Sequence, residues 1–291
     1  MTAIRTTPAA ATKFEVLEKG LRFPEAPRWH AGRLYYSDMY AGEVRSLDLN
    51  GHAEVVTRVP GHPSGLGWWP DGSLVIVSMQ DRRLLRIAPG DPSGRTTLVA
   101  DLSALAPFHC NDLVVDARGH AYVGNFGADI GAGAPPEPTC LICVTPDGRA
   151  RKVADDLMFP NGMVVTADDR TLIVAETFAS RLTAFDIAAD GSLSNRRVWA
   201  VLGGPLPDGI CLDAQNAIWV AAPFSNELLR VGEGGKVHER IEMASKPIAC
   251  VLGGPDGRTL FVLTSDDFEP EKTIARSAKI EIARVAVPAS A

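Results

Sequence analysis

The chain has 291 residues, of which 46% are hydrophobic and 22% charged, and this composition excludes a largely disordered protein. Its formal net charge of −6, with no run of Lys or Arg, argues against nucleic acid as a partner, because phosphate binding needs a clustered positive surface. The length fits either two domains or one large all-β domain.

The beginning of the chain does not indicate a secretory signal. Residues 1–12 contain one Arg and no apolar segment. We therefore expect a disordered tail, followed by one folded domain over residues 13–291. No apolar run approaches the roughly eighteen residues of a membrane span, so no membrane partner is expected either.

The cysteines indicate a reducing compartment. They are an odd number scattered over a long chain, which suits free thiols in the cytoplasm better than a disulfide framework: Cys110, Cys140, Cys143, Cys211 and Cys250. Cys140 and Cys143 form an isolated CxxC inside the apolar run "CLICV". Metal or redox use remains an alternative there, but we favour simple packing.

From Pro24 onward one pattern recurs six times. Each unit has a polar residue after Pro or a turn, a short apolar run, a turn with Asp or Gly, and further apolar runs. The first strands of the units read "PEAPRWHAGRLYYSD", "PSGLGWWPDGSLVIVS", "CNDLVVDARGHAYVGN", "PNGMVVTADDRTLIVAE", "PDGICLDAQNAIWVAA" and "PIACVLGGPDGRTLFVLTS". Long amphipathic helical periods are missing.

Aligning the units places one residue of each in register. These are Glu25, Ser64, Asn111, Asn161, Asp208 and Ile248, with steps of 39, 47, 50, 47 and 40 residues by subtraction. Such a period is typical of a propeller blade. The sequence therefore predicts an all-β, six-bladed propeller, with four-stranded antiparallel blades around a central channel.

A ring of six blades must close, because an open ring would leave two unpaired sheet edges. The run Lys13–Gly20 is a candidate strand that could join the last blade beside the run Ala278–Val287. The sequence leaves open which of these two strands is outermost.

Propeller geometry brings the aligned residues together. The first strand of each blade lies innermost, so a residue at its start lies at one mouth of the channel. We therefore expect Glu25, Asn111, Asn161 and Asp208 to converge, with Ser64 and Ile248 in the remaining sectors.

Carboxylates meeting in a narrow channel need a neutralising partner, because an unpaired buried charge is costly. A divalent cation would neutralise them, and an all-oxygen set favours a hard metal such as Ca²⁺, Mg²⁺ or Mn²⁺, with Zn²⁺ as a further alternative. The competing interpretation is that Asn161-Gly162 and Asp208-Gly209 are ordinary turns. Glu25 is not a turn residue, and we expect one bound cation, with Ca²⁺ as the first choice.

The motifs "FPEAPRW", "NDLVVDARGHAYVGN", "FPNGMVV" and "PDGICLDAQNAIWVA" resemble the senescence-marker-protein-30/gluconolactonase family. The resemblance runs from about Phe14 to the C-terminus. It implies a six-bladed propeller with one divalent metal, held by Glu25, Asn161 and Asp208. It also implies that Asn111 lies beside the metal on the substrate side and that Asp208 is the catalytic general base.

One departure concerns substrate recognition. Sugar-lactone hydrolases of the family usually carry an Arg two residues before the "ND" motif, where this chain has His109 in "FHCND". A substrate-binding pocket with Phe108, His109 and Phe126 would suit a lactone or ester less polar than a sugar lactone. The alternative is that His109 only packs or forms a turn. The other histidines lie in turn or surface contexts, and we expect most of them to be solvated.

Two long connections are expected at the same mouth, over residues 127–139 and 266–277, and loops of this length are often lids or binding loops. Short connections place Phe178 and Phe224 near the rim. Their alternative is ordinary loop exposure.

The preferred hypothesis is metal-assisted hydrolysis of a lactone. Serine catalysis is disfavoured because no G-x-S-x-G motif occurs. Two alternatives remain, namely a metal-dependent aryl esterase or phosphotriesterase, and a non-enzymatic interaction platform with a structural ion. The oligomeric state is left open.

Overall fold

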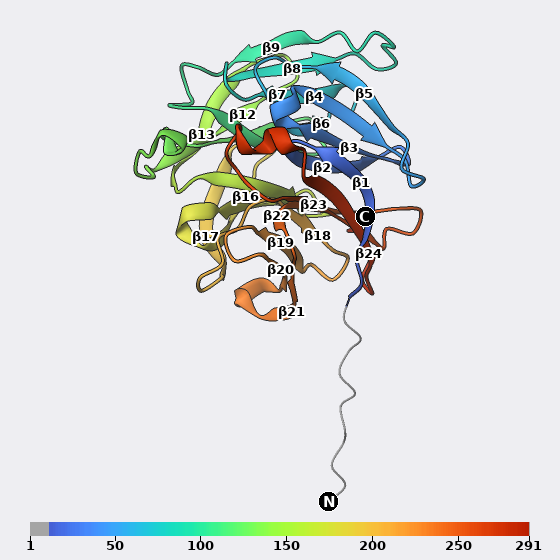
Figure 1. Ribbon diagram of the computed structural model, residues 1–291. Coiled ribbons are helices and arrows are strands. Elements are labelled where there is room, and N and C mark those ends of the chain that lie inside the picture. The colour runs from blue at the N-terminus through green and yellow to red at the C-terminus, as the bar shows by residue number, and fades with distance from the viewer. Residues whose placement is uncertain (1–11, 291) are drawn as a thin grey trace, which may run out of the picture.

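The structure is a computed structural model and describes residues 12–290. Six sheets of four strands surround a central axis (Figure 1), which confirms the predicted propeller. The predicted tail, residues 1–12, lies outside the described residues except for Thr12. The expectation of one domain over residues 13–291 stays a prediction.

Within each of the first five blades the strands run outward from the channel in chain order. Blade 1 comprises β2 (Pro24–His30), β3 (Arg33–Asp38), β4 (Glu43–Leu47) and β5 (Ala53–Arg58). Blade 2 comprises β6 (Pro63–Trp68), β7 (Leu74–Ser78), β8 (Arg83–Ile87) and β9 (Thr97–Asp101). Blade 3 comprises β10 (Cys110–Val115), β11 (Ala121–Asn125), β12 (Thr139–Val144) and β13 (Ala150–Leu157).

Blades 4 and 5 repeat the arrangement. Blade 4 comprises β14 (Pro160–Val165), β15 (Thr171–Glu176), β16 (Arg181–Ile187) and β17 (Leu193–Val201). Blade 5 comprises β18 (Ile210–Leu212), β19 (Ile218–Ala222), β20 (Glu227–Val231) and β21 (Val237–Glu242). Its innermost strand is short and begins two residues after Asp208, whose backbone N–H donates to the carbonyl of Ala221 at 2.8 Å.

Blade 6 closes the ring with both ends of the described chain. It comprises β22 (Lys246–Gly253), β23 (Thr259–Ser265) and β24 (Ala278–Arg284), and its outermost strand is β1 (Glu15–Leu21), which pairs antiparallel with β24. The blue β1 and the red β24 lie side by side in Figure 1. The predicted closure is thus confirmed, and the N-terminal strand is the outer one.

The innermost strands pack side by side around the whole channel, from β2 through β6, β10, β14, β18 and β22 and back to β2. Glycine permits this close approach. A Cβ on Gly162 would lie 2.6 Å from the carbonyl oxygen of Asp208, and one on Gly65 would lie 2.3 Å from the amide nitrogen of Leu113. Asn161-Gly162 is therefore part of a strand and not a turn, because its glycine is required by the neighbouring backbone.

A β-bulge marks the aligned position in most blades. In blade 4, three steps from Pro160 to Met163 lie opposite two steps from Glu176 to Val174. The same one-residue excess occurs on the innermost strands of blades 1, 2, 3 and 6. Because a bulge redirects a side chain out of the regular pleat, it turns the aligned residues toward the channel.

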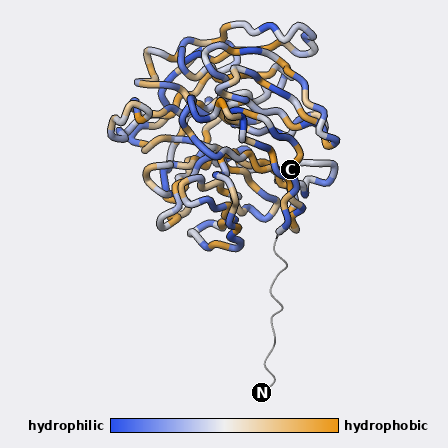
Figure 2. The backbone as a smooth tube through the Cα atoms, in the orientation of Figure 1, coloured by the Kyte–Doolittle hydropathy of each residue, from blue (hydrophilic) through white to orange (hydrophobic). Residues whose placement is uncertain are grey.

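The apolar core lies in layers between adjacent blades. One buried cluster joins Val75 and Leu84 of blade 2 to Leu113 and Val123 of blade 3. Hydrophobic and hydrophilic segments are interspersed along the backbone (Figure 2). The middle strands bury both faces, since every residue of β7, β12 and β19 is buried. No helix among residues 12–290 is long and apolar enough to cross a membrane.

The CxxC cysteines belong to these layers. Cys140 packs in the cluster between blades 2 and 3, whereas Cys143 packs in the cluster between blades 3 and 4. Residues three apart on a strand point to opposite faces, so these two thiols cannot bind one metal together. The favoured packing interpretation is confirmed.

The loops between the second and third strands of each blade open at one mouth of the channel. The two long ones cover residues 126–138 and 266–277 and contain the short 3₁₀ helices η2 (Ile130–Ala132) and η5 (Lys272–Ala275). Blades 1 and 4 carry η1 (Met39–Ala41) and η3 (Thr177–Ala179) at the same place, and η4 (Glu233–Gly235) lies between β20 and β21.

Candidate active site at the channel mouth

Two carboxylates from separate blades meet at the mouth. Asp208 is 8% exposed and Glu25 is partly exposed. Burial raises the pKa of Glu25 well above its usual range, and the charges of Asp208 and Asp112 raise it further. Burial also raises the pKa of Asp208 to about 8. A hydrogen bond from Asn161 lowers this pKa, and the charge of Asp112 raises it. Glu25, Asn161 and Asp208 therefore lie together, as the repeat predicts.

Amide and hydroxyl groups connect the blades around this centre. The Nδ2 of Asn111 donates to the Oδ1 of Asn161 at 2.9 Å, and both residues are 5% exposed. The Nδ2 of Asn161 donates to the hydroxyl of Thr177 at 3.2 Å. That hydroxyl donates to the carbonyl of Pro207 at 2.8 Å. These hydrogen bonds hold the Oδ1 of Asn161 toward Asn111 and connect the segment before Asp208 to blade 4.

The chain of hydrogen bonds continues into the first two blades. The hydroxyl of Ser64 lies 3.4 Å from the Oδ1 of Asn111, and the hydroxyl of Ser37 donates to the Ser64 carbonyl at 2.7 Å. Ser64 and Asn111 thus occupy neighbouring sectors, as predicted. Ile248 in the sixth sector is fully buried and packs with Phe23, Met39 and Met79, so this side of the ring is apolar.

A third carboxylate, Asp112, was not singled out in the sequence. Arg28 of blade 1 reaches it with a hydrogen bond of 3.0 Å and also donates to the Leu113 carbonyl at 2.5 Å. Burial raises the pKa of Asp112, and the Arg28 charge opposes this shift. The available signal was a break in the repeat, because the corresponding residues of neighbouring blades are Gly65 and Gly162.

The donor set fits a hard divalent cation. When ionised, Glu25 and Asp208 are two like charges close together, and the cation that acts on Glu25, Arg28, already bonds Asp112. Carboxylate oxygens and the Oδ1 of Asn161 are ligands that Ca²⁺ or Mg²⁺ prefer. Among residues 12–290 no three His, Cys, Asp or Glu side chains form a metal-binding group, so amide oxygens would have to complete the set.

The predicted substrate-side residues also lie at this mouth. The backbone N–H of Phe126 donates to the His109 carbonyl at 2.9 Å, and the two rings meet edge to face with centroids 6.2 Å apart. Phe108 stacks on His109 at 4.0 Å. Burial lowers the pKa of His109, so its imidazole is neutral at pH 7.

The expectation of solvated histidines is wrong for His120 and His62. His120 is 7% exposed and shares a 2.8 Å hydrogen bond with the buried Asp116. His62 is partly buried beside the ring of Tyr40, with centroids 5.6 Å apart. Turn signals alone could not show this, because the burial comes from neighbouring blades.

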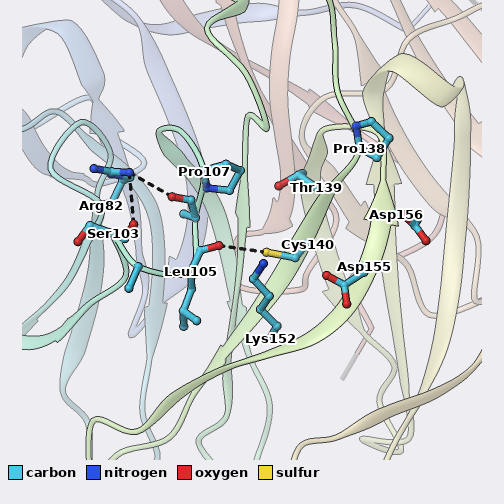
Figure 3. Close-up of a pocket in the computed structure, with 12 residues that line it drawn as sticks. Arg82, Ser103, Leu105, Pro107, Pro138, Thr139, Cys140, Lys152, Asp155 and Asp156 are labelled. Carbon is cyan, nitrogen blue, oxygen red and sulfur yellow. Dashed lines mark hydrogen bonds between the residues drawn. The ribbon is translucent and has the colours of Figure 1, made fainter.

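Three cavities elsewhere contain none of the predicted site residues, and one of them, of about 550 Å³, lies beside Thr145 and Asp190. Another, of about 370 Å³, lies between blades 2 and 3 and is lined by Arg82, Leu105, Cys140, Lys152 and Asp155, among others (Figure 3). In it Arg82 donates to the carbonyls of Ser103 and Ala106. The third, of about 780 Å³, lies between blades 4 and 5.

The amino-acid sequence was compared with protein families and with known proteins, and it is similar to members of one family. A family model described as the SMP-30/Gluconolactonase/LRE-like region matches residues 23–266. The 6-deoxy-6-sulfogluconolactonase of Pseudomonas putida is 26% identical over 259 residues, covering 86% of each chain. The diisopropyl-fluorophosphatase of Loligo vulgaris is 28% identical over 245 residues, covering 76% of each chain.

A solved structure shows the same fold. The regucalcin of Agrobacterium tumefaciens, described as a calcium-binding protein, superposes with a TM-score of 0.78 at 22% identity. The superposition covers 97% of this chain and all of the other.

Proposed function

The chain belongs to the SMP-30/Gluconolactonase/LRE-like family, and from this premise we propose that it is a metal-dependent hydrolase that opens lactone rings. One observation carries the proposal. Glu25 and Asp208, from blades far apart in sequence, are brought together with the side-chain amide of Asn161 beside Asp208 and its oxygen bonded to Asn111. A site of this kind suits a cation with oxygen ligands and an ester carbonyl next to it.

We assign the metal-ligating roles to Glu25, Asn161 and Asp208, with Ca²⁺ as the first choice of cation and Zn²⁺, Mg²⁺ or Mn²⁺ as alternatives. A divalent cation in such a site supplies Lewis-acid polarisation of the ester carbonyl. It would also counter the burial that raises the pKa of Asp208 and so favour the ionised carboxylate at neutral pH.

In the proposed reaction the Asp208 carboxylate acts as general base. It accepts a proton from a water molecule whose oxygen bonds to the carbonyl carbon of the lactone. The ring C–O bond then breaks, and the proton passes from Asp208 to the leaving alkoxide. The product is an open-chain hydroxy acid, and one water molecule is consumed.

Asn111 and His109 would orient the substrate. The Asn111 side chain is held by Asn161 and Ser64, so its position is fixed before a substrate arrives. His109 is neutral and Phe126 is apolar, and together they suit a substrate less polar than a sugar lactone.

A second candidate is hydrolysis of an aryl ester or a phosphotriester by the same residues. The likeness to diisopropyl-fluorophosphatase supports it, because that protein is similar over three quarters of both chains.

We also propose that the protein is cytoplasmic, since five cysteines without a disulfide framework suit a reducing compartment.

The test is metal removal followed by a substrate panel. Protein treated with chelator should lose hydrolysis of δ-valerolactone and regain it when Ca²⁺ is added. Asp208→Asn should lower kcat by about a hundredfold or more while the protein stays folded, and Glu25→Gln should weaken Ca²⁺ binding in calorimetry. Asp190→Asn and Glu54→Gln are matched controls, because both side chains are exposed at the surface.

Three results would count against the proposal. A chelated protein with full activity would remove the metal from the reaction. An unchanged kcat in Asp208→Asn would remove Asp208 as general base. Activity on a phosphotriester alone would favour the second candidate, and no turnover of any ester, with Ca²⁺ binding intact, would favour a non-enzymatic platform.

A further inference from the structure

Aromatic side chains surround the mouth of the channel beside the polar ring, the name we give to the aligned residues Glu25, Ser64, Asn111, Asn161 and Asp208. Some lie two or three residues before an aligned residue, and others lie in the loop that follows the second strand of a blade. We call them the aromatic collar: Phe23, Tyr40, His62, Phe108, His109, Phe126, Phe159, Phe178, Phe224 and Phe268. Every blade contributes at least one ring.

The collar consists of two runs of rings in contact. The first crosses blades 5, 6, 1 and 2, with centroid distances of 5.1 Å from Phe224 to Phe268, 6.2 Å to Phe23, 5.2 Å to Tyr40 and 5.6 Å to His62. The second crosses blades 3 and 4. In it, Phe126 lies 4.5 Å from Phe159, which lies 5.5 Å from Phe178.

The second run lies directly against the polar ring. The Phe159 carbonyl accepts a hydrogen bond from the backbone N–H of Thr177 at 3.1 Å, and the Thr177 side chain bonds Asn161. The carbonyl of His109 holds Phe126 in the same way. Rings and polar groups are therefore parts of one rigid arrangement, and Phe126 and Phe178 remain partly exposed at the mouth.

The backbone is strained to place one of these rings. Phe159 has φ of 58°, and His62, at the corresponding place in blade 2, has φ of 64°. A bulky side chain in the left-handed region costs about 1–2 kcal/mol, and glycine would adopt it freely. A strained aromatic residue beside a candidate active site indicates that the ring itself is needed.

The collar offers few free hydrogen-bonding groups besides its two imidazoles, and of these the His62 Nδ1 has no partner among the described residues. The Tyr40 hydroxyl donates to the Phe268 carbonyl at 2.9 Å, and the Thr177 hydroxyl donates to Pro207. Burial lowers the pKa of both His62 and His109, so neither is a cation at pH 7. The hydroxyls of a sugar lactone would leave water and find few partners here, which is unfavourable.

We infer that the substrate carries an aryl group that packs against Phe126, Phe159 and Phe178 while its lactone carbonyl faces the polar ring. This inference rests on the proposed hydrolase function and narrows it to aryl lactones. The flat rings of blades 3 and 4 match a flat aryl group, and contact between such rings is favourable.

The test compares three six-membered lactones that share one reacting group. Dihydrocoumarin has a fused aryl ring, δ-valerolactone has no substituent, and glucono-δ-lactone carries hydroxyls. We expect kcat/KM to be highest for dihydrocoumarin and at least about tenfold lower for glucono-δ-lactone. Phe178→Ala should lower the ratio of kcat/KM for dihydrocoumarin to kcat/KM for δ-valerolactone by roughly threefold to tenfold. Phe178→Tyr should retain this ratio.

Phe126→Leu serves as a second variant if Phe178→Ala folds poorly, and Val198→Ala, on the exposed outer strand of blade 4, is the control. A preference for glucono-δ-lactone, or ratios that stay unchanged in both ring variants, would overturn the inference and leave the hydrolase proposal standing.

Binding without turnover separates the two proposals. Lactams are not hydrolysed under these conditions, so calorimetry with 3,4-dihydroquinolin-2-one and δ-valerolactam measures recognition alone. Tighter binding of the aryl lactam, lost in Phe178→Ala, would support the aryl site even if no lactone were hydrolysed. Equal binding of the two lactams would overturn it even in an active hydrolase.

Discussion

Replacing Gly162 by Ala tests the close approach of the innermost strands. An added Cβ would lie 2.6 Å from the Asp208 carbonyl oxygen and 2.6 Å from the amide nitrogen of Ile210. Ordinary contact begins at 3.4 Å, so blades 4 and 5 must separate by roughly 0.8 Å, the difference between these distances. Both clashing atoms belong to the backbone and cannot rotate away.

We expect Gly162→Ala to lower the free energy of unfolding by about 2–3 kcal/mol, the upper part of the range for overpacking. It should also weaken the 3.2 Å hydrogen bond from the Gly162 N–H to the Asp208 carbonyl. Because a shift of about 1 Å in a catalytic group can cost a hundredfold in rate, turnover should fall by at least about tenfold.

Urea unfolding followed by tryptophan fluorescence measures the stability, and lactone hydrolysis measures the rate. Gly131→Ala is the matched control, since its Cβ would meet only the Asp129 carboxylate, at 3.7 Å. That control should change stability by less than about 1 kcal/mol. A Gly162→Ala protein as stable and as active as the control would refute the close packing of β14 against the segment around Asp208.

Two further predictions concern the buried charges. In metal-free protein the pKa of Asp208 is raised from 3.8 to about 8, so its contribution to stability is complete below about pH 4 and is lost as the pH rises toward 8. Relative to Asp208→Asn, the free energy of unfolding of the wild type, measured by urea titration, should fall by up to about 4 kcal/mol between pH 4 and pH 7. The same pH dependence in both proteins would contradict this. Arg28→Met should lower the free energy of unfolding by about 3–5 kcal/mol, because it leaves the carboxylate of Asp112 buried without its partner. The double variant Arg28→Met/Asp112→Leu should recover most of that loss, and a single variant as stable as the wild type would show that the pair is unimportant.

The repeat explains why so much of the fold could be predicted. Each blade must place a polar residue, an apolar run and a turn at the same intervals, so the aligned positions of Glu25, Asn161 and Asp208 follow from spacing alone. Closure by an N-terminal strand follows from the cost of open edges. The order of β1 and β24 did not follow, because both runs alternate in the same way and either could pair on both sides.

The site was harder to predict where it depends on contacts between blades. Asp112 and Arg28 lie on the innermost strands of blades 3 and 1, and no local pattern links two such residues. The hydroxyl of Thr177 bridges Asn161 and Pro207 only because the loop of blade 4 reaches the segment before blade 5. Likewise, the rings of the collar are scattered along the sequence and become neighbours only when the ring of blades closes.

The blade that contains both β1 and β24 also sets the order of folding. During synthesis, residues 15–21 leave the ribosome long before their partner strand over residues 278–284. Until then the growing chain exposes an unpaired edge, and pairing across nearly the whole length is slow because it closes a very long loop. This strand pair completes blade 6 and closes the ring, so a nascent chain depends on protection from association longer than a protein built from local hairpins.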